Sequence, residues 1–370
     1  MPTDAIGRLS RQLRRFLRKR GATDAEVDRA VDAENLALLV LDREIMPGAR
    51  RYTMHELARR GGTDIETARA VWRAIGFPDM PDDRPAFRDT DVAALRAFLR
   101  TFANPWIEDW SLDRALRQAR VLGASLARSA DAVTDEIAAS FETAFARGVS
   151  DPQLAEGLAE VVDFDGVARL VAHVFRLQMR ASLWRRLAGA SPELPGTVTG
   201  SVGFVDLVGY TALVNELDAD EVAALVSRFG ELTHDRVVAG GGRVVKTIGD
   251  EVMFIADSVE AAAHIAVDLT VHSLRDDLLP ATRAGIATGT MVSRDGDYYG
   301  PVVNLAARLT EMARPGTVLA SAEIGEALAD DEHFTMRRIA GRKVRDIGRV
   351  DVFRLDPARP PPDRSVTSKP

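Results

Sequence analysis

Two aspartates in the second half of the chain stand where carboxylates could bind a metal ion. Asp206 ends the apolar run in FVDLVGYT, and Asp250 lies in the turn of KTIGDEVM, between two runs rich in β-branched residues. If the first run pairs beside that hairpin, the two carboxylates face each other. Paired oxygen ligands of this kind suit Mg²⁺ bound to a phosphate substrate. Taken alone, the two positions equally fit a strand-end polar residue and a turn former.

A second pair of polar residues falls in GDYYGPVVNLAARLTEMARPG, where Asn304 and Arg308 are four residues apart on a predicted helix. Residues at this spacing share one helix face. A guanidinium offers a planar fork of donors that matches phosphate oxygens. The alternative for the arginine is an ordinary surface ion pair with a carboxylate such as Glu311.

Alternating strands and helices carry these side chains. TVTGSVGFVDL and GGRVVKTIGDEVMFIA are β-branched runs bounded by glycine, and Gly249-Asp250 interrupts the second run as a hairpin turn would. DADEVAALVSRFGELTHDRVVA and SVEAAAHIAVDLTVHSLRD have the pattern of helices. The order strand, helix, hairpin, helix, strand predicts an α+β domain with helices on one face of a mainly antiparallel sheet.

The first half of the chain has a different pattern of apolar residues, and this pattern predicts an all-α domain. Apolar residues recur every three or four positions in ENLALLVLDREI, DVAALRAFLRTF and FDGVARLVAHVFRLQMRASLWRRL. AGASPELPG then supplies the prolines and glycines of a linker. The predicted division is a helical domain at 1–187, a linker at 188–198, an α+β domain at 199–356 and a proline-rich, disordered tail at 357–370.

Composition narrows the class of protein. The 370 residues are 46% hydrophobic and 28% charged, as in soluble globular proteins. No apolar run approaches the roughly 18 to 20 residues of a membrane span, and the N-terminus lacks the apolar core of a signal peptide. The chain has no cysteine, which excludes thiolate chemistry and fits a cytoplasmic location. A net charge of -7 weighs against a nucleic-acid partner.

The order of the polar residues resembles the catalytic domain of class III nucleotide cyclases, the adenylyl and guanylyl cyclase family. The resemblance runs from about residue 200 to 355, through FVDLVGYT, VVKTIGDEVMF, GIATGTMVSRDGDYYGPVVNLAARL and VRDIGRVDVFRL. It implies a ferredoxin-like, palm-type sheet. Six polar positions match in type and order: Asp206, Lys246, Asp250, Asp297, Asn304 and Arg308.

The resemblance implies a metal site made by Asp206, Leu207 and Asp250. Two Mg²⁺ or Mn²⁺ ions would activate the ribose 3′-hydroxyl and grip the β- and γ-phosphates. Asn304 would orient the ribose, and Arg308 would stabilise the charge that builds on the α-phosphate.

Two further groups of residues are implied to bind the triphosphate. The backbone N–H groups of Gly209, Tyr210 and Thr211 would face the phosphates where the next helix begins. Arg345 is the match for a cation near the last strands, although the family usually has lysine followed by glycine there and this chain has Arg345-Asp346.

Hydrogen-bond chemistry then favours ATP. Lys246 has donors only, and ionised Asp297 has acceptors only. Adenine presents an acceptor at N1 and donors at N6, which complement these two groups. Guanine presents the reverse, and each mispaired polar group would cost roughly 1 to 3 kcal/mol.

In this family the metal aspartates come from one protomer, and the base-reading and transition-state residues come from the other. Because this chain carries all six, the resemblance implies a homodimer with two shared active sites.

The helical half resembles, over about residues 5 to 185, the regulatory region of actinobacterial, pH-responsive adenylyl cyclases, including NLALLVLDREIMPG. The stretch from 51 to 98 also has the outline of a MerR-type winged helix, but its candidate recognition segment DIETARAVWRAIG mixes acids with arginines, which weighs against DNA binding. A proton on His55 or His173, or an apolar ligand, could be the regulatory signal. The basic start RLSRQLRRFLRKR is predicted to pack on this domain rather than to lie on a membrane.

The resulting prediction is an adenylyl cyclase controlled by its N-terminal domain. The alternatives are a guanylyl cyclase and a catalytically silent, cyclase-fold signalling or DNA-binding regulator. A silent protein would be expected to lack one or more of the six polar residues, and all six are present.

Overall fold

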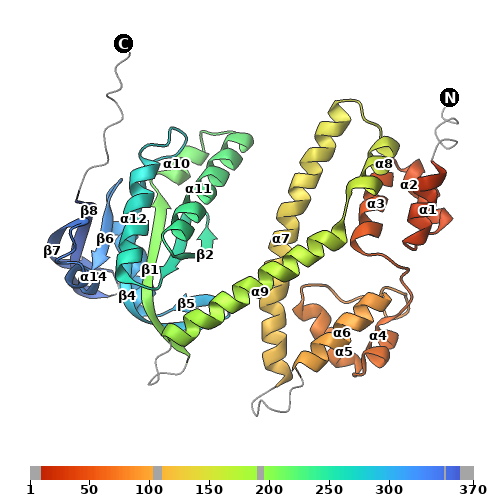
Figure 1. The fold of residues 1–370 in the computed structure, drawn as a ribbon, viewed down its shortest axis with the longest axis horizontal. Coiled ribbons are helices and arrows are strands. Elements are labelled where there is room, and N and C mark those ends of the chain that lie inside the picture. The colour runs from red at the N-terminus through yellow and green to blue at the C-terminus, as the bar shows by residue number, and fades with distance from the viewer. Residues whose placement is uncertain (1–9, 103–110, 190–195, 346, 359–370) are drawn as a thin grey trace. The chain divides into compact units, whose positions relative to one another are not determined.

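The computed structural model describes residues 10–102, 111–189, 196–345 and 347–358. Most of the predicted linker and nearly all of the predicted tail therefore lie outside the described residues. The chain divides into two compact units, Met1–Leu177 and Gln178–Pro370. The first is drawn in red to yellow-green and the second in green to blue (Figure 1).

The first unit is helical, as predicted. Apart from the helices, its described residues contain one isolated bridge between Tyr52 and Phe87. Threonine caps begin two of the helices with reciprocal capping boxes, Thr23 with Glu26 and Thr53 with Glu56. The helices are α1 (Arg11–Lys19), α2 (Asp24–Asp32), α3 (Leu36–Ile45), α4 (Met54–Gly61), α5 (Ile65–Ala74), α6 (Asp89–Phe102), α7 (Leu112–Ala146), α8 (Asp151–Val161) and α9 (Phe164–Gly189), which runs past the boundary between the units.

Two separate apolar clusters hold this unit together. One joins α1, α2, α3 and α8, and the other joins α4, α5, α6 and the start of α7. Leu13 and Leu17 of the basic helix α1 are 2% and 0% exposed. The apolar side of α1 is therefore buried in its own domain, which agrees with the packing interpretation of this segment. Among the described residues, no helix combines the length and hydropathy needed to cross a bilayer.

The second unit is built on one sheet with the strand order β2-β3-β1-β4-β6-β8-β7, and β5 pairs with β4. Every neighbouring pair is antiparallel except β4 with β6, so the sheet is mainly antiparallel, as predicted. The strands are β1 (Thr197–Leu207), β2 (Arg243–Ile248), β3 (Glu251–Ala256), β4 (Thr282–Arg294), β5 (Asp297–Tyr299), β6 (Val318–Ser321), β7 (Phe334–Val344) and β8 (Gly348–Pro357).

Helices cover both faces of the sheet. α11 (Ala219–Ala239), α12 (Val259–Ser273) and α14 (Ala322–Ala327) bury one face in the largest apolar cluster. α13 (Pro301–Met312) packs on the opposite face, against residues such as Val202 and Phe204 of β1. The expectation of helices on one face therefore holds for three helices and needs correction for α13. Gly285 permits this approach, because a Cβ there would lie 2.3 Å from the backbone nitrogen of Thr310.

Candidate active site

The two aspartates predicted to form a metal site come together at one end of β1. In the sheet, Asp206 is paired with Glu251 of β3 on one side and with Arg283 of β4 on the other. Asp250 lies in the two-residue turn between β2 and β3, where Gly249 adopts the left-handed conformation with φ 63°. The N–H of Leu207 donates to the carbonyl oxygen of Asp250 over 3.1 Å. Strand pairing thus places the two carboxylates side by side.

Arg283 is a member of this cluster that the sequence interpretation missed. Its guanidinium holds Oδ2 of Asp206, with Nε at 2.7 Å, and its Nη1 donates to the carbonyl oxygen of Glu311 at 3.1 Å. Asp206 and Arg283 are 77 residues apart in sequence, and only the pairing of β1 with β4 brings them together. The available signal was that Arg283 is the lone charged residue in the run LLPATRAGIATGTMVS.

The cluster accumulates negative charge in a partly buried place. Burial raises the pKa of Asp206, with Arg283 opposing and the neighbouring Asp250 carboxylate adding to the rise. Burial, together with the charges of Asp206 and Asp250, raises the pKa of Glu251 to about 7. Carboxylates that repel one another in this way are stabilised by a cation between them.

The donor set fits a hard divalent cation. Asp206 and Asp250 offer only carboxylate oxygens, and Mg²⁺ commonly takes one or two carboxylates and completes its shell with water and substrate phosphates. Within the described ranges, no three acidic or histidine side chains form a self-sufficient metal cage. The side chain of Leu207 is buried in the core, so this residue could contribute only its main-chain carbonyl.

The two residues predicted to read the base also come together. Nζ of Lys246 on β2 lies 2.5 Å from Oδ2 of Asp297 on β5, and the N–H of Tyr298 donates to the other Asp297 oxygen at 2.8 Å. Nη2 of Arg243 donates to the hydroxyl of Tyr298 at 3.1 Å. The carboxylate is therefore held in place by its own strand, with the lysine ammonium directly against it.

The remaining predicted residues lie on α13, on a short helix and in a turn. Asn304 is exposed on α13, and Nη1 of Arg308 pairs with Oε1 of Glu311 at 2.6 Å, so the surface ion pair that the sequence allowed is present. Gly209 is the N-cap of α10 (Tyr210–Val214), and Thr211 is exposed in its first turn. Arg345 is exposed in the turn that joins β7 to β8.

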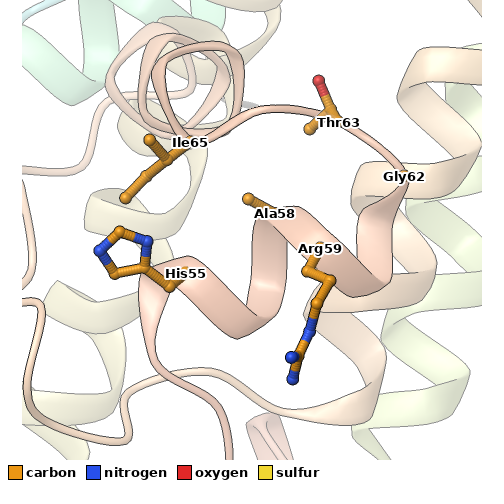
Figure 2. Close-up of a pocket in the computed structure, with 6 residues that line it drawn as sticks. All are labelled: His55, Ala58, Arg59, Gly62, Thr63 and Ile65. Atoms are coloured by element: carbon orange, nitrogen blue, oxygen red, sulfur yellow. The ribbon is translucent and has the colours of Figure 1, made fainter.

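The two histidines singled out in the helical half are both exposed. His55 lines a surface pocket of about 510 Å³ at the turn between α4 and α5 (Figure 2). Ala58, Arg59, Gly62, Thr63 and Ile65 line the rest of that pocket. His173 lies on α9, among other solvent-exposed residues.

Sequence comparison with named proteins identifies the family to which this chain belongs. An adenylate cyclase of Glutamicibacter nicotianae is 32% identical to this chain over 337 residues, which cover 85% of this chain and 81% of that protein. This chain belongs to the adenylate cyclase family. An adenylate cyclase of Streptomyces coelicolor is 34% identical over 301 residues, covering 81% of this chain and 78% of that protein.

The adenylate cyclase family also accounts for both halves of the chain. The model of the adenylate and guanylate cyclase catalytic domain matches residues 196–356, and the model of the adenylate cyclase regulatory domain matches residues 3–183. A pH-sensitive adenylate cyclase of Mycobacterium tuberculosis is 30% identical over 358 residues, covering 92% of this chain and 86% of that protein. The predicted membership of the class III cyclases, with a regulatory domain in front, is confirmed. Catalytic domains of this class generally depend on divalent metal ions.

Proposed function

We propose that this chain converts ATP into 3′,5′-cyclic AMP and pyrophosphate, under the control of its helical N-terminal domain. The observation that carries the choice of substrate is the pair of Lys246 and Asp297, 2.5 Å apart. A donor-only group beside an acceptor-only group complements N1 and N6 of adenine and opposes the corresponding atoms of guanine. We propose the domain division 1–187, 188–198 and 199–356 for this enzyme.

In this proposal Asp206, Asp250 and the carbonyl of Leu207 hold two Mg²⁺ or Mn²⁺ ions. Bound ions of this kind supply activation of the ribose 3′-hydroxyl and neutralisation of the triphosphate charge. Arg283 keeps the Asp206 carboxylate oriented by occupying one of its oxygens, which leaves the other oxygen for a metal ion.

The other residues bind and orient the substrate. Arg308 exchanges its partly exposed partner Glu311 for an oxygen of the α-phosphate, an exchange that costs little because exposed ion pairs contribute only about 0 to 1 kcal/mol. Asn304 positions the ribose so that its 3′-hydroxyl lies in line with the α-phosphorus. The backbone of Gly209, Tyr210 and Thr211, together with Arg345, receives the outer phosphates.

The test of the reaction is direct. Purified full-length chain is incubated with Mn²⁺ and either ATP or GTP, and cyclic nucleotide is measured by chromatography. Cyclic AMP from ATP is the expected product. Cyclic GMP as the main product would favour the guanylyl cyclase alternative, and no cyclic nucleotide from either substrate would favour the silent regulator.

The base pocket is tested by Lys246→Glu. The variant places acceptors against N1 of adenine, so we expect the ratio of kcat/KM for ATP over GTP to fall by about tenfold or more, since one mispaired group costs roughly 1 to 3 kcal/mol. Lys19→Glu, on the exposed surface of α1, is the matched control and should leave the ratio unchanged. An unchanged ratio in Lys246→Glu would remove the base-reading role from this lysine.

We also propose that two copies share each active site, with the aspartates from one and Asn304 and Arg308 from the other. Asp206→Ala and Arg308→Ala chains should each lose about 10² to 10³ in rate or more. Mixing the two inactive chains should restore activity, because one of the two sites in a mixed dimer is intact. Mixed dimers without activity would refute shared sites.

For regulation we propose that the segment from Met179 to Gly196 transmits the state of the helical domain to the catalytic domain. The signal is either a proton on His55 or His173 or an apolar ligand. Substituting both histidines by asparagine in the full chain separates these two signals. A pH-rate profile unchanged by the double substitution would exclude the protons.

A further inference from the structure

Two cationic side chains of β2, Arg243 and Lys246, reach the same face of the catalytic sheet although they lie three positions apart. In a regular strand, residues at an odd spacing point to opposite faces. Here Arg243 is paired with Ile255 of β3, and Lys246 is paired with Met253. Ile255 and Met253 both belong to the apolar cluster that α13 helps to form. Residues directly opposite each other in an antiparallel pair share a face, so both cations project on the α13 side.

A β-bulge at Val245 produces this arrangement. The register of β2 shifts between Val244 and Lys246, which leaves Val245 as the extra residue. Without the bulge, Lys246 would stand opposite Val252, whose side chain belongs to the cluster on the other face. The bulge therefore brings the ammonium of Lys246 to the side where Asp297 lies. A bulge also interrupts the hydrogen-bond ladder, so its geometry depends on contacts from outside β2 and β3.

The carboxylate of the base-reading pair stands on a short element. β5 has three residues, and a two-residue turn joins it to β4. The turn consists of Asp295 and Gly296, with φ 55° and 85°, as in the tight turns that fix the register of a hairpin. In the sheet order β3 and β1 lie between β2 and β4, so among the described strands β2 and β5 are not neighbours. Contacts between side chains must therefore hold β2 and β5 at a fixed separation.

Arg243 and Tyr298 form such a contact beside the base-reading pair. Nη2 of Arg243 donates to the hydroxyl of Tyr298 at 3.1 Å, and the guanidinium carbon lies 5.8 Å from the centre of the ring. The ring itself packs on the cluster that α13 helps to form. This contact and the Lys246–Asp297 pair join β2 to two successive residues of β5, with one contact on each side of the bulge.

Stability alone does not explain an arginine at this position. Nε of Arg243 is buried and, among the described residues, has no hydrogen-bond partner. A buried donor without a partner is destabilising, and apolar groups of the same shape can remove that penalty. The hydroxyl of Tyr298 accepts from the other end of the guanidinium and orients it. A polar contact retained in such a place calls for a task, and the base-reading pair is next to it.

Substrate binding gives the two contacts different roles. Oδ1 of Asp297 is occupied by the N–H of Tyr298, so Oδ2, which holds Lys246, is the oxygen left for N6 of adenine. The ammonium of Lys246 must likewise turn to N1. The base therefore competes with this ion pair for its atoms. The contact between Arg243 and Tyr298 uses none of those atoms and can persist while the base is bound.

We infer that Arg243 and Tyr298 are positioning residues for base selection. Their contact holds the bulge of β2 and the short strand β5 at the separation at which Lys246 meets N1 and Asp297 meets N6. Neither of the two residues needs to touch the nucleotide. The inference rests on the proposed function, since it concerns how the proposed base-reading pair is held when its ion pair opens. Two polar groups discriminate between bases only when both are held in place, because a loosely held group can adapt to the wrong base.

The removal of one oxygen atom from the full chain tests the inference. In Tyr298→Phe the ring keeps its packing, and Arg243 loses its acceptor. We expect the ratio of kcat/KM for ATP over GTP to fall about fivefold, the factor that corresponds to one typical hydrogen bond. The fall should come from a higher KM for ATP, with kcat within about twofold of wild type. A merely structural loss would lower the active fraction, and thus kcat for both nucleotides alike, without changing the ratio.

The neighbouring tyrosine supplies the matched control. Tyr299 is 50% exposed, and Tyr299→Phe removes the same atom, so its ratio should stay at the wild-type value. Arg243→Met removes the other half of the contact, and Arg243→Lys, which keeps a donor, should recover part of the lost ratio. If the two residues act as one unit, the double variant with Arg243→Met and Tyr298→Phe should lose no more than either single variant. Losses that add in the double variant would mean that the two residues act independently, and the inference would be wrong.

Nucleotides that cannot react separate base selection from chemistry. 3′-deoxy-ATP and 3′-deoxy-GTP lack the attacking hydroxyl, and isothermal titration calorimetry with Mn²⁺ measures their dissociation constants on the full chain. The preference for 3′-deoxy-ATP should narrow about fivefold in Tyr298→Phe and stay unchanged in Tyr299→Phe. An unchanged preference in Tyr298→Phe overturns the inference, and so does an equal change in the control.

The same assays distinguish a failure of this inference from a failure of the proposed function. If Lys246→Glu lowers the ratio for ATP over GTP and Tyr298→Phe does not, the base-reading pair stands and the positioning role is wrong. If Lys246→Glu leaves the ratio unchanged, the pair does not read the base, and the positioning role falls with it.

Discussion

The catalytic sheet and the long helices of the regulatory half differ in how much of their apolar surface is buried within a single chain. The sheet is covered on both faces, by α11, α12 and α14 on one side and by α13 on the other. The helical half has two small clusters, and beyond them the second half of α7 and nearly all of α9 are exposed. The first arrangement is complete within one chain, whereas the second leaves apolar and charged faces that a partner can cover.

This difference has a consequence for how the enzyme is assembled. A sheet with both faces covered can be stable in a single copy, so its proposed dimer serves to complete active sites. Helices without a core of their own gain stability only from packing against another element. The regulatory half is therefore the part of the chain whose stability should depend on protein concentration.

The largest effect that tests this comparison comes from truncating an apolar side chain in each region. Phe254 of β3 is fully buried in the main cluster, and Leu170 of α9 is 61% exposed. Phe254→Ala should lower the free energy of unfolding of the catalytic unit by about 3 to 5 kcal/mol. In dilute protein, Leu170→Ala should change the free energy of unfolding of the helical unit by less than about 0.5 kcal/mol. Urea denaturation followed by circular dichroism measures both changes.

The concentration of protein provides the control for that pair. In Leu170→Ala the loss should grow as the chain is concentrated, because association covers α9 and buries the side chain that the variant lacks, while the loss in Phe254→Ala should not depend on concentration. A loss of several kcal/mol in dilute Leu170→Ala would mean that α9 is packed within its own chain, and the contrast between the two regions would not hold.

The sequence predicted the local parts of the site and missed the parts made by distant strands. Gly249-Asp250 indicated a hairpin, and the apolar run before Asp206 indicated a strand end, because turn residues and alternation are local signals. Arg283 was missed because its contact with Asp206 depends on which strand pairs with β1. The general prediction of helices on one face did not anticipate α13 for a similar reason: a side chain at Gly285 would prevent the approach of α13, and this is apparent only in three dimensions.

The helical half was predicted correctly as all-α, but periodicity said nothing about which helix faces are covered. The run FDGVARLVAHVFRLQMRASLWRRL has the apolar spacing of a buried helix, and α9 is nevertheless exposed. The spacing of apolar residues shows that a helix has an apolar face. Only the structure shows whether another element of the same chain packs against that face.

A smaller effect is expected from a polar contact at the edge of the catalytic core. Oδ2 of Asp276 accepts from Nε of Arg228 on α11 at 2.8 Å, and Oδ1 accepts from the N–H of Leu278 at 3.0 Å. Burial alone would raise the pKa of Asp276, but the Leu278 N–H and the Arg228 guanidinium hold it below the usual value. A carboxyl with a lowered pKa in the folded state stabilises the fold above its unfolded pKa of about 3.8, and this contribution is lost as the pH falls through the folded pKa.

Asp276→Asn should therefore destabilise the catalytic unit by about 1 to 2 kcal/mol at pH 7, and the difference from wild type should shrink as the pH falls below about 4. Urea denaturation at several pH values measures this change. The neighbouring Asp277 is exposed, and Asp277→Asn is the control that should follow wild type at every pH. A difference from wild type that persists at low pH would assign the effect to packing rather than to charge.

The smallest expected effect lies in the regulatory half, where one side chain ties two helices together. Asn35, the N-cap of α3, makes no capping hydrogen bond with its side chain. Instead the carboxylate of Asp151, at the start of α8, accepts from the N–H groups of Leu36 at 2.7 Å and Ala37 at 3.0 Å. This cap comes from a residue 115 positions away, so it is lost whenever α8 moves away from α3. The contact is therefore expected to contribute little stability to the helical half.

Asp151→Ala should cost about 1 kcal/mol of local stability, as the loss of a helix cap usually does. Hydrogen exchange followed by mass spectrometry should then show the amides at the start of α3 exchanging several-fold faster, with β1 and β3 unaffected. Asp113→Ala, in the first turn of α7, is the control and should leave exchange in α3 unchanged. If exchange in the catalytic sheet also rose, the two halves would unfold together, and the contrast between a self-sufficient sheet and a partner-dependent helical half would have to be abandoned.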